Sequence, residues 1–546
     1  MNSNNLKRRQ FLQSVAYSGL VYGSGALPHL ISSANAMPVP LTNKILVNLN
    51  LSGGPDLRHL VVPAFDSSEF SFGNKYWNHR SRSHKLTETG VTAQQRYDND
   101  YVEFVVGDSN WNATGLVDPV GVNAGVRFGI WKEAGWLIDM FSSGNVALVF
   151  NAVGGTNRAH DLSSRMLAQG NLLSNLNSGN YSGWGGRLAR SAGGNSISLT
   201  SSPSNFSFGP LGAAPGYDPS KVDTIDLLSI KDSRNVGLFD FDFEDNQQGN
   251  SDDIMARAAK SYYASLRQEG VATAYQKFMD HESKIREFGD LLSARLNDVD
   301  VPIPTLINAL RNNVDEINPD PNDLANIGRR VLRRTDFGNQ IRNLYDLIAA
   351  NDLVNPSVLS MSYGSWDTHG DQRQVPSVFA TDPTNPYENR GIESNLRDIF
   401  TGQFGGNPSD STALHGGFSA LYASLSAADR SKMVITIAGE FGRQIRDNGD
   451  AGTDHGKGNL MLVVGEGVRG GVYGEIFQDA EIEKYDDTSL NTPDIDPLTE
   501  IDEIFAPVCD WVTANSGTAV FPRTHPSYTG DAPDIEMPGM FNNLMI

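Results

Sequence analysis

Five short runs of apolar residues stand out along the chain, and their length and β-branched content predict buried strands. The runs are residues 45–51, 146–150, 358–361, 434–438 and 460–464. Segments with apolar residues at helical spacing separate some of them, and these are residues 131–141, 160–168, 337–350 and 417–425. Continuous apolar strands that alternate with helices are typical of a parallel sheet covered on both faces. The pattern therefore predicts an α/β fold with a doubly wound, mostly parallel sheet.

Other segments interrupt this alternation and are predicted to be insertions in one large domain of residues 37–546. They lie at about residues 66–125, 200–330 and 373–412. The first is rich in Asn, Asp, Tyr and Trp and has no clear period. The second passes from a stretch rich in Ser, Pro and Gly to largely helical spacing. We therefore expect the core sheet to be built from the rest of the domain.

Four of the predicted strands are followed by small residues together with charged or hydroxyl side chains. In chain order these are Asp56, Thr156, Arg158, His160, Asp367, His369, Glu440 and Arg443. Asp454 and His455 lie in the loop between the last two apolar runs. In a parallel α/β sheet, the carboxyl ends of the strands lie at one edge, and ligands bind there. The sequence therefore predicts that these side chains gather into one site.

Six of these residues carry donor atoms that a divalent metal ion can use. They are Asp56, Asp367, His369, Glu440, Asp454 and His455. Carboxylates and imidazoles brought to one rim from distant positions suit a Zn²⁺, Mn²⁺ or mixed oxygen and nitrogen site. We therefore expect a divalent ion (Zn²⁺, Mn²⁺ or Ca²⁺), present as one or two ions, to be the cofactor.

Each candidate also has a purely structural interpretation. Asp56 and Asp367 could cap a turn or a helix. Glu440 and Arg443 are close enough in sequence to form a local ion pair. Thr156 could be the N-cap of the following helix. The functional interpretation depends on all of these groups meeting at one edge of the sheet.

The charge of the chain limits its partners. With 64 acidic and 43 basic residues, the formal net charge is −21 at pH 7. Such a charge argues against nucleic acids and anionic membranes as partners. An anionic substrate would have to be held by local cations or a metal ion against this field. The single cysteine, Cys509, excludes an internal disulfide.

The first 36 residues predict an exported protein. Arg8 and Arg9 precede a Phe-Leu pair and a weakly apolar segment, and the sequence Ala34-Asn35-Ala36 resembles a signal-peptide cleavage site. This combination is typical of a twin-arginine leader, although an ordinary basic leader would also direct export. No later stretch reaches the roughly 18 apolar residues that a membrane span needs. We therefore expect the twin-arginine export machinery to be a partner, no membrane span to remain after leader cleavage, and the protein to lie in the periplasm, at the cell surface or outside the cell.

These motifs resemble those of an exported bacterial family, domain of unknown function 1501. The shared features are the leader, the Gly53-Gly54-x-Asp56 strand end, Asn157-Arg158-x-His160, Asp367-Thr368-His369-x-x-Gln372, Glu440-Phe441-Gly442-Arg443 and Thr453-Asp454-His455-Gly456. That family in turn resembles the alkaline phosphatase-like superfamily, which includes phosphatases, sulfatases and phosphoglycerate mutases. Its members have a parallel sheet whose carboxyl edge holds one or two metal ions and a Ser, Thr or modified Cys nucleophile.

The resemblance implies a role for each matching residue. Asp56, Asp367, His369 and His455 would be metal ligands, and Glu440 would stand where the superfamily has an Asp-His pair. Phe441, the next residue, cannot bind a metal ion. Thr156 would be the nucleophile, activated by a metal ion or by His160. Arg158 or Arg443 would steady the transferred group.

The expected function is therefore an exported, metal-dependent hydrolase of phosphate or sulfate esters, acting on a small-molecule or polymer-linked anionic ester. The alternative is a secreted binding or structural protein that keeps the scaffold, and one metal ion at most, without turnover. The oligomeric state is not predicted.

Overall fold

The structure is a computed structural model of the chain. It describes residues 41, 43–155, 158–170, 182–200, 204–209, 228–234, 288–289, 291–296, 304, 306–307, 337–373, 391–402, 415–491, 493–521 and 540–546. The predicted leader and the predicted nucleophile Thr156 lie outside these residues. Within the described part, every helix is too short or too polar to cross a membrane.

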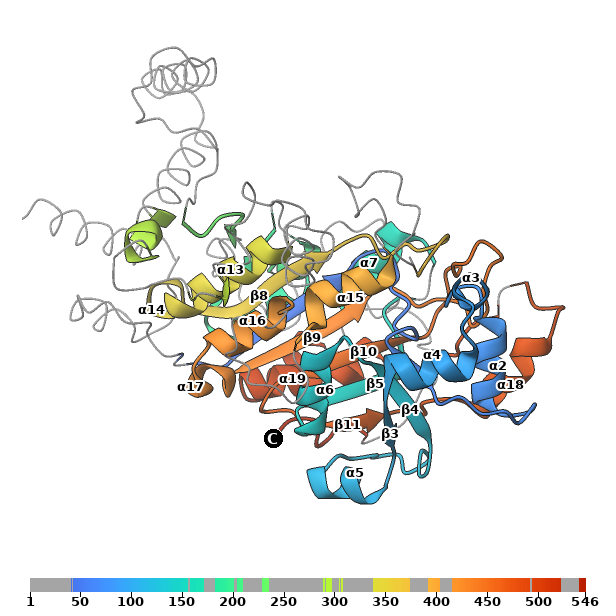
Figure 1. The fold of residues 1–546 in the computed structure, drawn as a ribbon. Coiled ribbons are helices and arrows are strands. Elements are labelled where there is room, and N and C mark those ends of the chain that lie inside the picture. The colour runs from blue at the N-terminus through green and yellow to red at the C-terminus, as the bar shows by residue number, and fades with distance from the viewer. Residues whose placement is uncertain are drawn as a thin grey trace, which may run out of the picture.

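A central sheet forms the framework of the described residues (Figure 1). Its strands are β1 (Ile45–Leu51), β5 (Val146–Val153), β6 (Asn195–Ser198), β7 (Leu228–Ser229), β8 (Pro356–Tyr363), β9 (Met433–Gly439), β10 (Asn459–Val464), β11 (Gly471–Tyr473) and β12 (Thr499–Glu500). The spatial order is β11-β5-β10-β9-β1-β8-β6-β7, and β12 pairs with β5. All five predicted apolar runs are strands of this sheet.

The strand directions agree with the prediction of a mostly parallel sheet. β1 is parallel to both β8 and β9, whereas β10 is antiparallel to both β9 and β5. β5 therefore runs in the same direction as β9, β1 and β8. The antiparallel direction of β10 was not predicted. The connection after β9, residues 440–458, contains no helix, whereas parallel neighbours are usually joined by a helical crossover.

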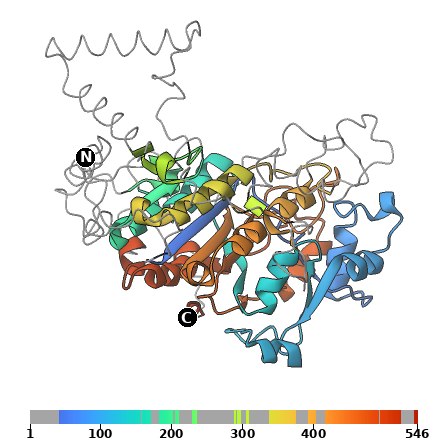
Figure 2. The same ribbon diagram turned by 60° about the vertical axis from the view of Figure 1, so that its left-hand side comes forward.

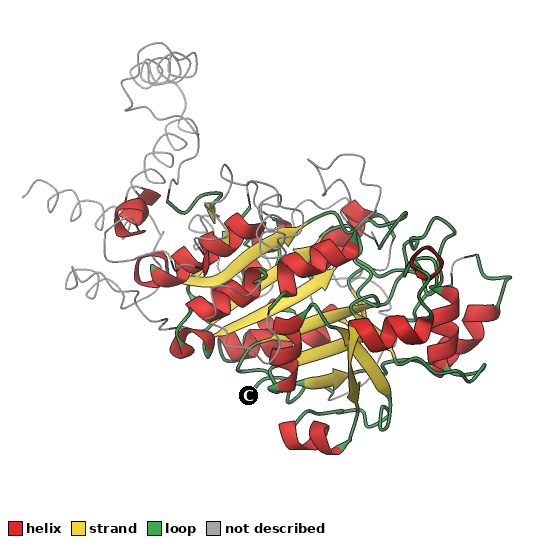
Figure 3. Ribbon diagram, viewed as in Figure 1, coloured by secondary structure: helices red, strands yellow, loops and turns green. Residues whose placement is uncertain are grey.

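Helices cover both faces of the central sheet, as predicted. Along β1, Ile45, Val47 and Leu49 enter one apolar cluster, whereas Leu46 enters a second. The first cluster contains residues of α6 (Gly135–Ser142), α13 (Phe337–Ala349), α15 (Ile392–Phe400) and α16 (Gly417–Ser424). The second contains residues of α7 (His160–Gln169), α8 (Trp184–Ala192) and α19 (Ile501–Val512). In Figure 3 the strands are seen behind α13, α15 and α16.

Shorter elements complete the described fold. They are η1 (Asn205–Ser207), α14 (Asn351–Val354), α17 (Ala427–Arg430), α18 (Asp479–Asp486) and α20 (Gly517–Val520). Cys509 is a buried, unpaired residue of α19.

The first predicted insertion has more regular structure than its aperiodic sequence indicates. It contains α2 (Phe72–His79), α3 (Leu86–Thr89), α4 (Ala93–Asp100), β3 (Tyr101–Val105) and α5 (Ser109–Thr114). β3 joins β2 (Val61–Pro63) and β4 (Arg127–Trp131) in a separate antiparallel sheet of order β2-β4-β3. Figures 1 and 2 both show these blue elements on one side of the central sheet. We call residues 61–131 the side unit.

The other two predicted insertions lie largely outside the described residues. Within the third, α15 is described and packs its Ile392, Leu396 and Ile399 into the core. That helix therefore contributes to the covered face of the central sheet.

Candidate metal centre

The four strand ends singled out in the sequence meet at one edge, because β1, β5, β8 and β9 run in the same direction. Three contacts show the convergence. Gly53, after β1, donates its backbone N–H to Glu440 Oε1, after β9, at 2.9 Å. His160, after β5, lies with its Nδ1 2.7 Å from the same oxygen. Arg443, after β9, donates to Asp367, after β8, at 2.8 Å.

A group that could hold a metal ion lies at this edge. His160, Asp367 and His455 each offer one ligand atom, and these atoms all lie within 4.8 Å of one another. Asp367 Oδ1 is 3.0 Å from His455 Nε2, and its Oδ2 is 3.4 Å from His160 Nε2. His369 joins the group through its Nε2, which is 3.1 Å from Asp367 Oδ1 and 2.9 Å from His455 Nε2. Three imidazoles thus surround one carboxylate.

The Nδ1 atom of each imidazole, on the side of the ring away from Asp367, lies against a hydrogen-bond acceptor. His455 Nδ1 lies 2.9 Å from the backbone carbonyl of Arg158, and a carbonyl can only accept, so Nδ1 carries the proton. His369 Nδ1 lies 2.9 Å from Asp454 Oδ1, and His160 Nδ1 lies 2.7 Å from Glu440 Oε1. In a neutral ring, this leaves the Nε2 lone pair pointing toward Asp367. Such second partners fix ring orientation and tautomer at metal sites.

The Nε2 atoms and the Asp367 carboxylate lie close enough to share a proton or a metal ion. Burial lowers the pKa of His455, although its bonds to Asp367 and to Arg158 act in the opposite direction. With its Nδ1 proton donated to the Arg158 carbonyl, His455 can bind Asp367 through a second proton, as an imidazolium, or through a metal ion bound to both groups. Partial burial would raise the pKa of Asp367, but hydrogen bonds with His455 and Arg443 outweigh it and hold this pKa well below its usual range. The carboxylate is therefore ionised.

Two predicted ligands lie behind the histidines. Asp454 Oδ1 accepts from Asn448 Nδ2 at 3.0 Å as well as from His369, and the Asn448 bond lowers its pKa. Glu440 is 1% exposed, and its Oε1 is shared by Gly53 and His160. Its Oε2 is buried without a partner among the described residues. Both acids therefore orient imidazoles in this structure.

The position of Arg443 does not fit its predicted role of holding the substrate. Its side chain is fully covered. Besides Asp367, it donates to the carbonyls of Gly54 at 2.6 Å, Gly53 at 2.6 Å, Thr453 at 2.9 Å and Trp366 at 3.0 Å. It thus ties together the ends of β1 and β8 and the loop before His455, and it fixes Asp367 from behind.

Asp56 is also placed differently from its predicted role as a ligand. It is 1% exposed and forms a buried ion pair with Arg80, and its Oδ2 also accepts from Gln372 Nε2 at 2.7 Å. It is not part of the three-residue metal group. Arg80 was not singled out in the sequence, because it lies in the aperiodic first insertion and nothing in its neighbours marks it.

The remaining candidates lie at the start of α7. The Arg158 side chain is 30% exposed and pairs with Asp494. His160 was predicted as an acid–base group and lies instead in the metal group. The N-cap residue of α7 is Ala159, whose side chain makes no capping hydrogen bond, and the positive end of the helix dipole at this place favours negative charge. Thr156 lies outside the described residues.

The loops that carry these residues are held in uncommon backbone conformations. Ser365, Asp371 and Ala451 have φ of 71°, 43° and 57°, in the left-handed region that non-glycine residues seldom adopt. Such strain persists where surrounding contacts impose it, and it concentrates at functional sites. Gly53, with φ of 119°, has no room for a side chain, because a Cβ there would lie 2.6 Å from Asp367 N.

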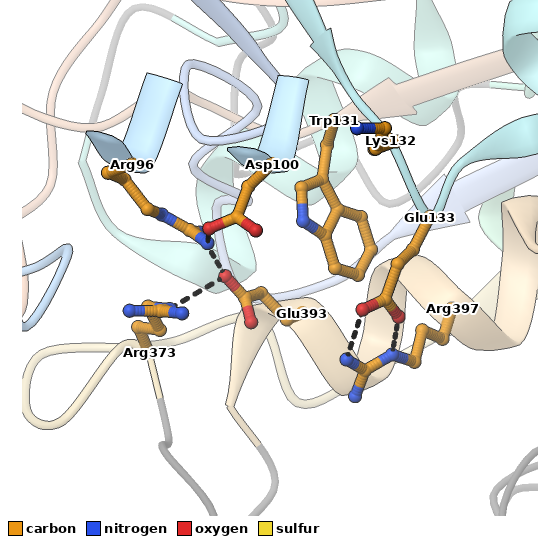
Figure 4. Close-up of a pocket in the computed structure, with 8 residues that line it drawn as sticks. All are labelled: Arg96, Asp100, Trp131, Lys132, Glu133, Arg373, Glu393 and Arg397. Atoms are coloured by element: carbon orange, nitrogen blue, oxygen red, sulfur yellow. Dashed lines mark hydrogen bonds and ion pairs between the residues drawn. The ribbon is translucent and has the colours of Figure 1, made fainter. Parts of the chain in front are cut away.

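A separate cavity of about 270 Å³ lies between α4, β4 and α15 (Figure 4). Its walls are mostly paired charges. Glu393 accepts from Arg96 and from Arg373, the latter at 3.0 Å, and Arg397 pairs with Glu133. None of the residues of the metal group lines it. Of these pairs, Arg96–Glu393 joins the side unit to α15.

Comparisons with known proteins give one partial match. A family model described as "Protein of unknown function (DUF1501)" matches residues 394–494, the segment that carries Glu440, Arg443, Asp454 and His455. No curated protein and no solved structure matches the chain significantly. The family resemblance drawn from the motifs is therefore supported for this segment.

Proposed function

We propose that this protein is an exported, metal-dependent hydrolase of phosphate or sulfate esters, with an alkaline phosphatase-like arrangement of its sheet and site. One observation carries the proposal. His160, His369 and His455 each have Nδ1 against an acceptor and Nε2 against the carboxylate of Asp367. This is the donor arrangement that a divalent cation requires.

The donor set bears on the identity of the ion. Three imidazole nitrogens and one carboxylate suit Zn²⁺ and other first-row transition metals. Ca²⁺, which the sequence also allowed, prefers six to eight oxygen ligands and fits this set less well. Since Glu440 and Asp454 are engaged by imidazoles, the donors support one ion better than two.

An ion bound here would supply a Lewis acid and lower the pKa of a bound water. The chain itself supplies the means to attract an anionic ester. The N-terminus of α7 and the partly exposed Arg158 lie beside the metal group, and both favour negative charge. They act at short range in a protein whose net charge of −21 would otherwise repel an anion.

The attacking group in this proposal is Thr156 or a water molecule. Thr156 lies two residues before Arg158 and four before His160, in the connection from β5 to α7. A hydroxyl at this place would need a neighbouring base or cation to lower its pKa. Replacing Thr156 by Val separates the two options, because only a threonine nucleophile would be lost.

The decisive experiment is metal analysis combined with ester hydrolysis. We expect the purified full chain to hold close to one transition-metal ion and to hydrolyse p-nitrophenyl phosphate or p-nitrophenyl sulfate. His455→Ala should lose both properties. His79→Ala, a matched histidine variant whose side chain pairs with Asp486 on the surface, should keep both. A wild-type protein with no bound metal under any loading condition would refute the proposal.

A specific observation favours the second candidate, a metal-holding protein without turnover. Phe441 is fully buried, and its ring lies 4.5 Å from the ring of His455 and 5.0 Å from that of His160. An apolar ring thus closes one side of the metal group, where a two-metal enzyme has a further ligand. Tight metal binding without hydrolysis of either ester would support this candidate.

A further inference from the structure

We propose that Gln372 is a positioning residue for the metal group, and that Asp56 and Arg80 set its orientation. The inference rests on the proposed metal site, but it does not depend on which reaction, if any, takes place there. It assigns a functional role to the side unit, which supplies Arg80 and contributes none of the metal-binding donors.

Arg80 anchors the network from the side unit. It follows α2 as its C-terminal cap and is 1% exposed. Its Nε donates to the carbonyl of Ile445 at 3.0 Å, and its Nη2 donates to the carbonyl of Gln444 at 2.6 Å. Its Nη1 pairs with Asp56, which is also 1% exposed. An ion pair this well covered has one geometry, because either charge left alone would be costly to bury.

Asp56 then determines which way the amide of Gln372 faces. A carboxylate can only accept, so the Gln372 atom 2.7 Å from Asp56 Oδ2 must be the Nε2 donor. The amide carbonyl therefore points to the opposite side. A protonated Asp56 could instead donate to the amide oxygen, so either orientation of the Gln372 amide would then form a hydrogen bond with Asp56.

The carbonyl of Gln372 joins the two loops that carry the metal group. Its Oε1 accepts from the Thr453 hydroxyl at 2.9 Å and from the Thr368 hydroxyl at 3.4 Å. Thr368 stands between Asp367 and His369, and Thr453 precedes Asp454 and His455. The Gln372 amide, which is 0% exposed, thus holds the loop of Asp367 and His369 in a fixed position relative to the loop of Asp454 and His455.

The backbone on either side of the Gln372 side chain is fixed as well. The Gln372 N–H donates to Ala451 at 2.9 Å, and its carbonyl accepts from the N–H of Ile392, at the start of α15, at 2.8 Å. The next residue, Arg373, donates to Glu393 (Figure 4). It also donates to the carbonyl of His84 in the side unit. The side unit and α15 therefore determine together where the loop carrying Asp367 and His369 lies.

The test uses a nearly isosteric variant, Gln372→Met, with Co²⁺ as the probe ion and the full chain as the protein. Asn343→Leu on α13 is the matched control. Asn343 is a buried amide that also makes three hydrogen bonds, to Ser233, Ile230 and Lys231, and none of them involves a residue of the metal group. Both variants should lower the unfolding midpoint. Only Gln372→Met should raise the dissociation constant for Co²⁺, by about 10–100-fold, and change the visible absorption of the bound ion.

Each outcome decides a different point. If folded Gln372→Met binds Co²⁺ as tightly as the wild type, the positioning role is refuted and the proposed function stands. If Gln372→Met does not fold, Thr453→Val removes one hydroxyl from the same amide and should weaken Co²⁺ binding more than Asn343→Leu does; equal binding would refute the role.

If the wild type binds neither Co²⁺ nor any other metal under any loading condition, the proposed function is refuted, and the imidazole proton resonances of His369 and His455 in the metal-free protein decide the positioning role. Resonances that shift in Gln372→Met and not in Asn343→Leu support it. Unchanged resonances refute it.

Discussion

His369 and His455 come from two different loops, and their Nε2 atoms lie 2.9 Å apart. A hydrogen bond at Nδ1 fixes the orientation of each ring: the partner of His369 is Asp454, and the partner of His455 is the carbonyl of Arg158. Both Nε2 atoms also face the carboxylate of Asp367, at 3.1 Å for His369 and 3.0 Å for His455. A metal ion bound to these atoms would satisfy the two imidazoles and the carboxylate together, and the predictions for the metal group follow from that proposal.

Asp367→Asn should abolish tight metal binding while the fold is kept. The substitution preserves the shape of the side chain and removes the charge that the three imidazoles surround. We expect the dissociation constant for Zn²⁺, measured by competition with a chromogenic chelator, to rise at least about 100-fold. Asp371→Asn, an exposed acid four residues away that pairs with Lys85, is the control and should bind Zn²⁺ like the wild type. Equal affinity of the two variants would contradict the site.

Glu440→Gln should weaken metal binding without abolishing it. Glu440 holds His160 through Nδ1, and Gln can still accept that hydrogen bond but carries no charge. We expect a loss of about 10–100-fold in Zn²⁺ affinity, which is smaller than the loss for Asp367→Asn. A loss as large as that of Asp367→Asn, seen in the same competition assay, would show that Glu440 is itself a ligand.

Gly53→Ala should disturb the site more than a comparable glycine substitution elsewhere. The new Cβ would lie 2.6 Å from Asp367 N at a φ of 119°, and we expect a loss of about 3 kcal/mol in unfolding free energy with weaker Zn²⁺ binding. The control is Gly90→Ala, at a φ of 66° with no atom within 4 Å of the new Cβ. It should cost about 1–2 kcal/mol and leave Zn²⁺ binding unchanged. Denaturant unfolding and metal titration of both variants measure the difference.

The protein should lose stability as the pH falls below about 6.5. His59 and His84 are fully buried and stacked, with ring centroids 4.4 Å apart. Burial lowers the pKa of both in the folded protein, and nearby Arg96 acts in the same direction. Below the unfolded pKa, only the unfolded chain takes up these protons, so acid favours unfolding.

Each histidine contributes a slope of up to about 1.4 kcal/mol per pH unit. Urea unfolding between pH 6.5 and pH 5.5 measures this slope, and His84→Asn should reduce it. A wild-type unfolding free energy that does not change over this interval would contradict the prediction.

Arg8→Lys combined with Arg9→Lys should keep the protein inside the cell with residues 1–36 attached. Twin-arginine export depends on the arginine pair, whereas a general basic leader needs only positive charge. Fractionation and mass measurement of the product give the readout. Export and cleavage of the doubly substituted chain would instead indicate the general route.

The alternation of apolar runs predicted five of the nine strands of the described central sheet and the gathering of four strand ends, but not the shorter strands β6, β7, β11 and β12. β1 has the predicted bounds, and β5 extends past the predicted run to Val153. Asn151, an amide within that strand, ended the apolar run without ending the backbone pairing. The direction of β10 could not be read from its residues, because a buried strand has the same composition in either direction.

The roles of individual site residues were harder to predict than their location. A carboxylate that follows a strand can bind a metal ion, an arginine or an imidazole. Which of these it binds depends on the group that the fold places beside it, and the sequence does not show that group. Asp56 faces Arg80 from a segment without periodicity, and Glu440 faces His160. His160 was identified as a candidate, but its place among the donors depends on the path of the chain between β5 and α7.

β10 lies between β9 and β5 and pairs with both. The loop of residues 440–458 is therefore held at each end by strands in the interior of the central sheet. The loop is also bonded across itself, from the Gln444 N–H to the Asp454 carbonyl at 2.9 Å, and to the loop of Asp367, from the Thr453 N–H to the Thr368 carbonyl at 3.3 Å, so opening it as a lid would break these bonds. Any ligand of this edge must meet Asp367 and His455 in the arrangement they already have, so recognition at the site should be of the lock-and-key kind.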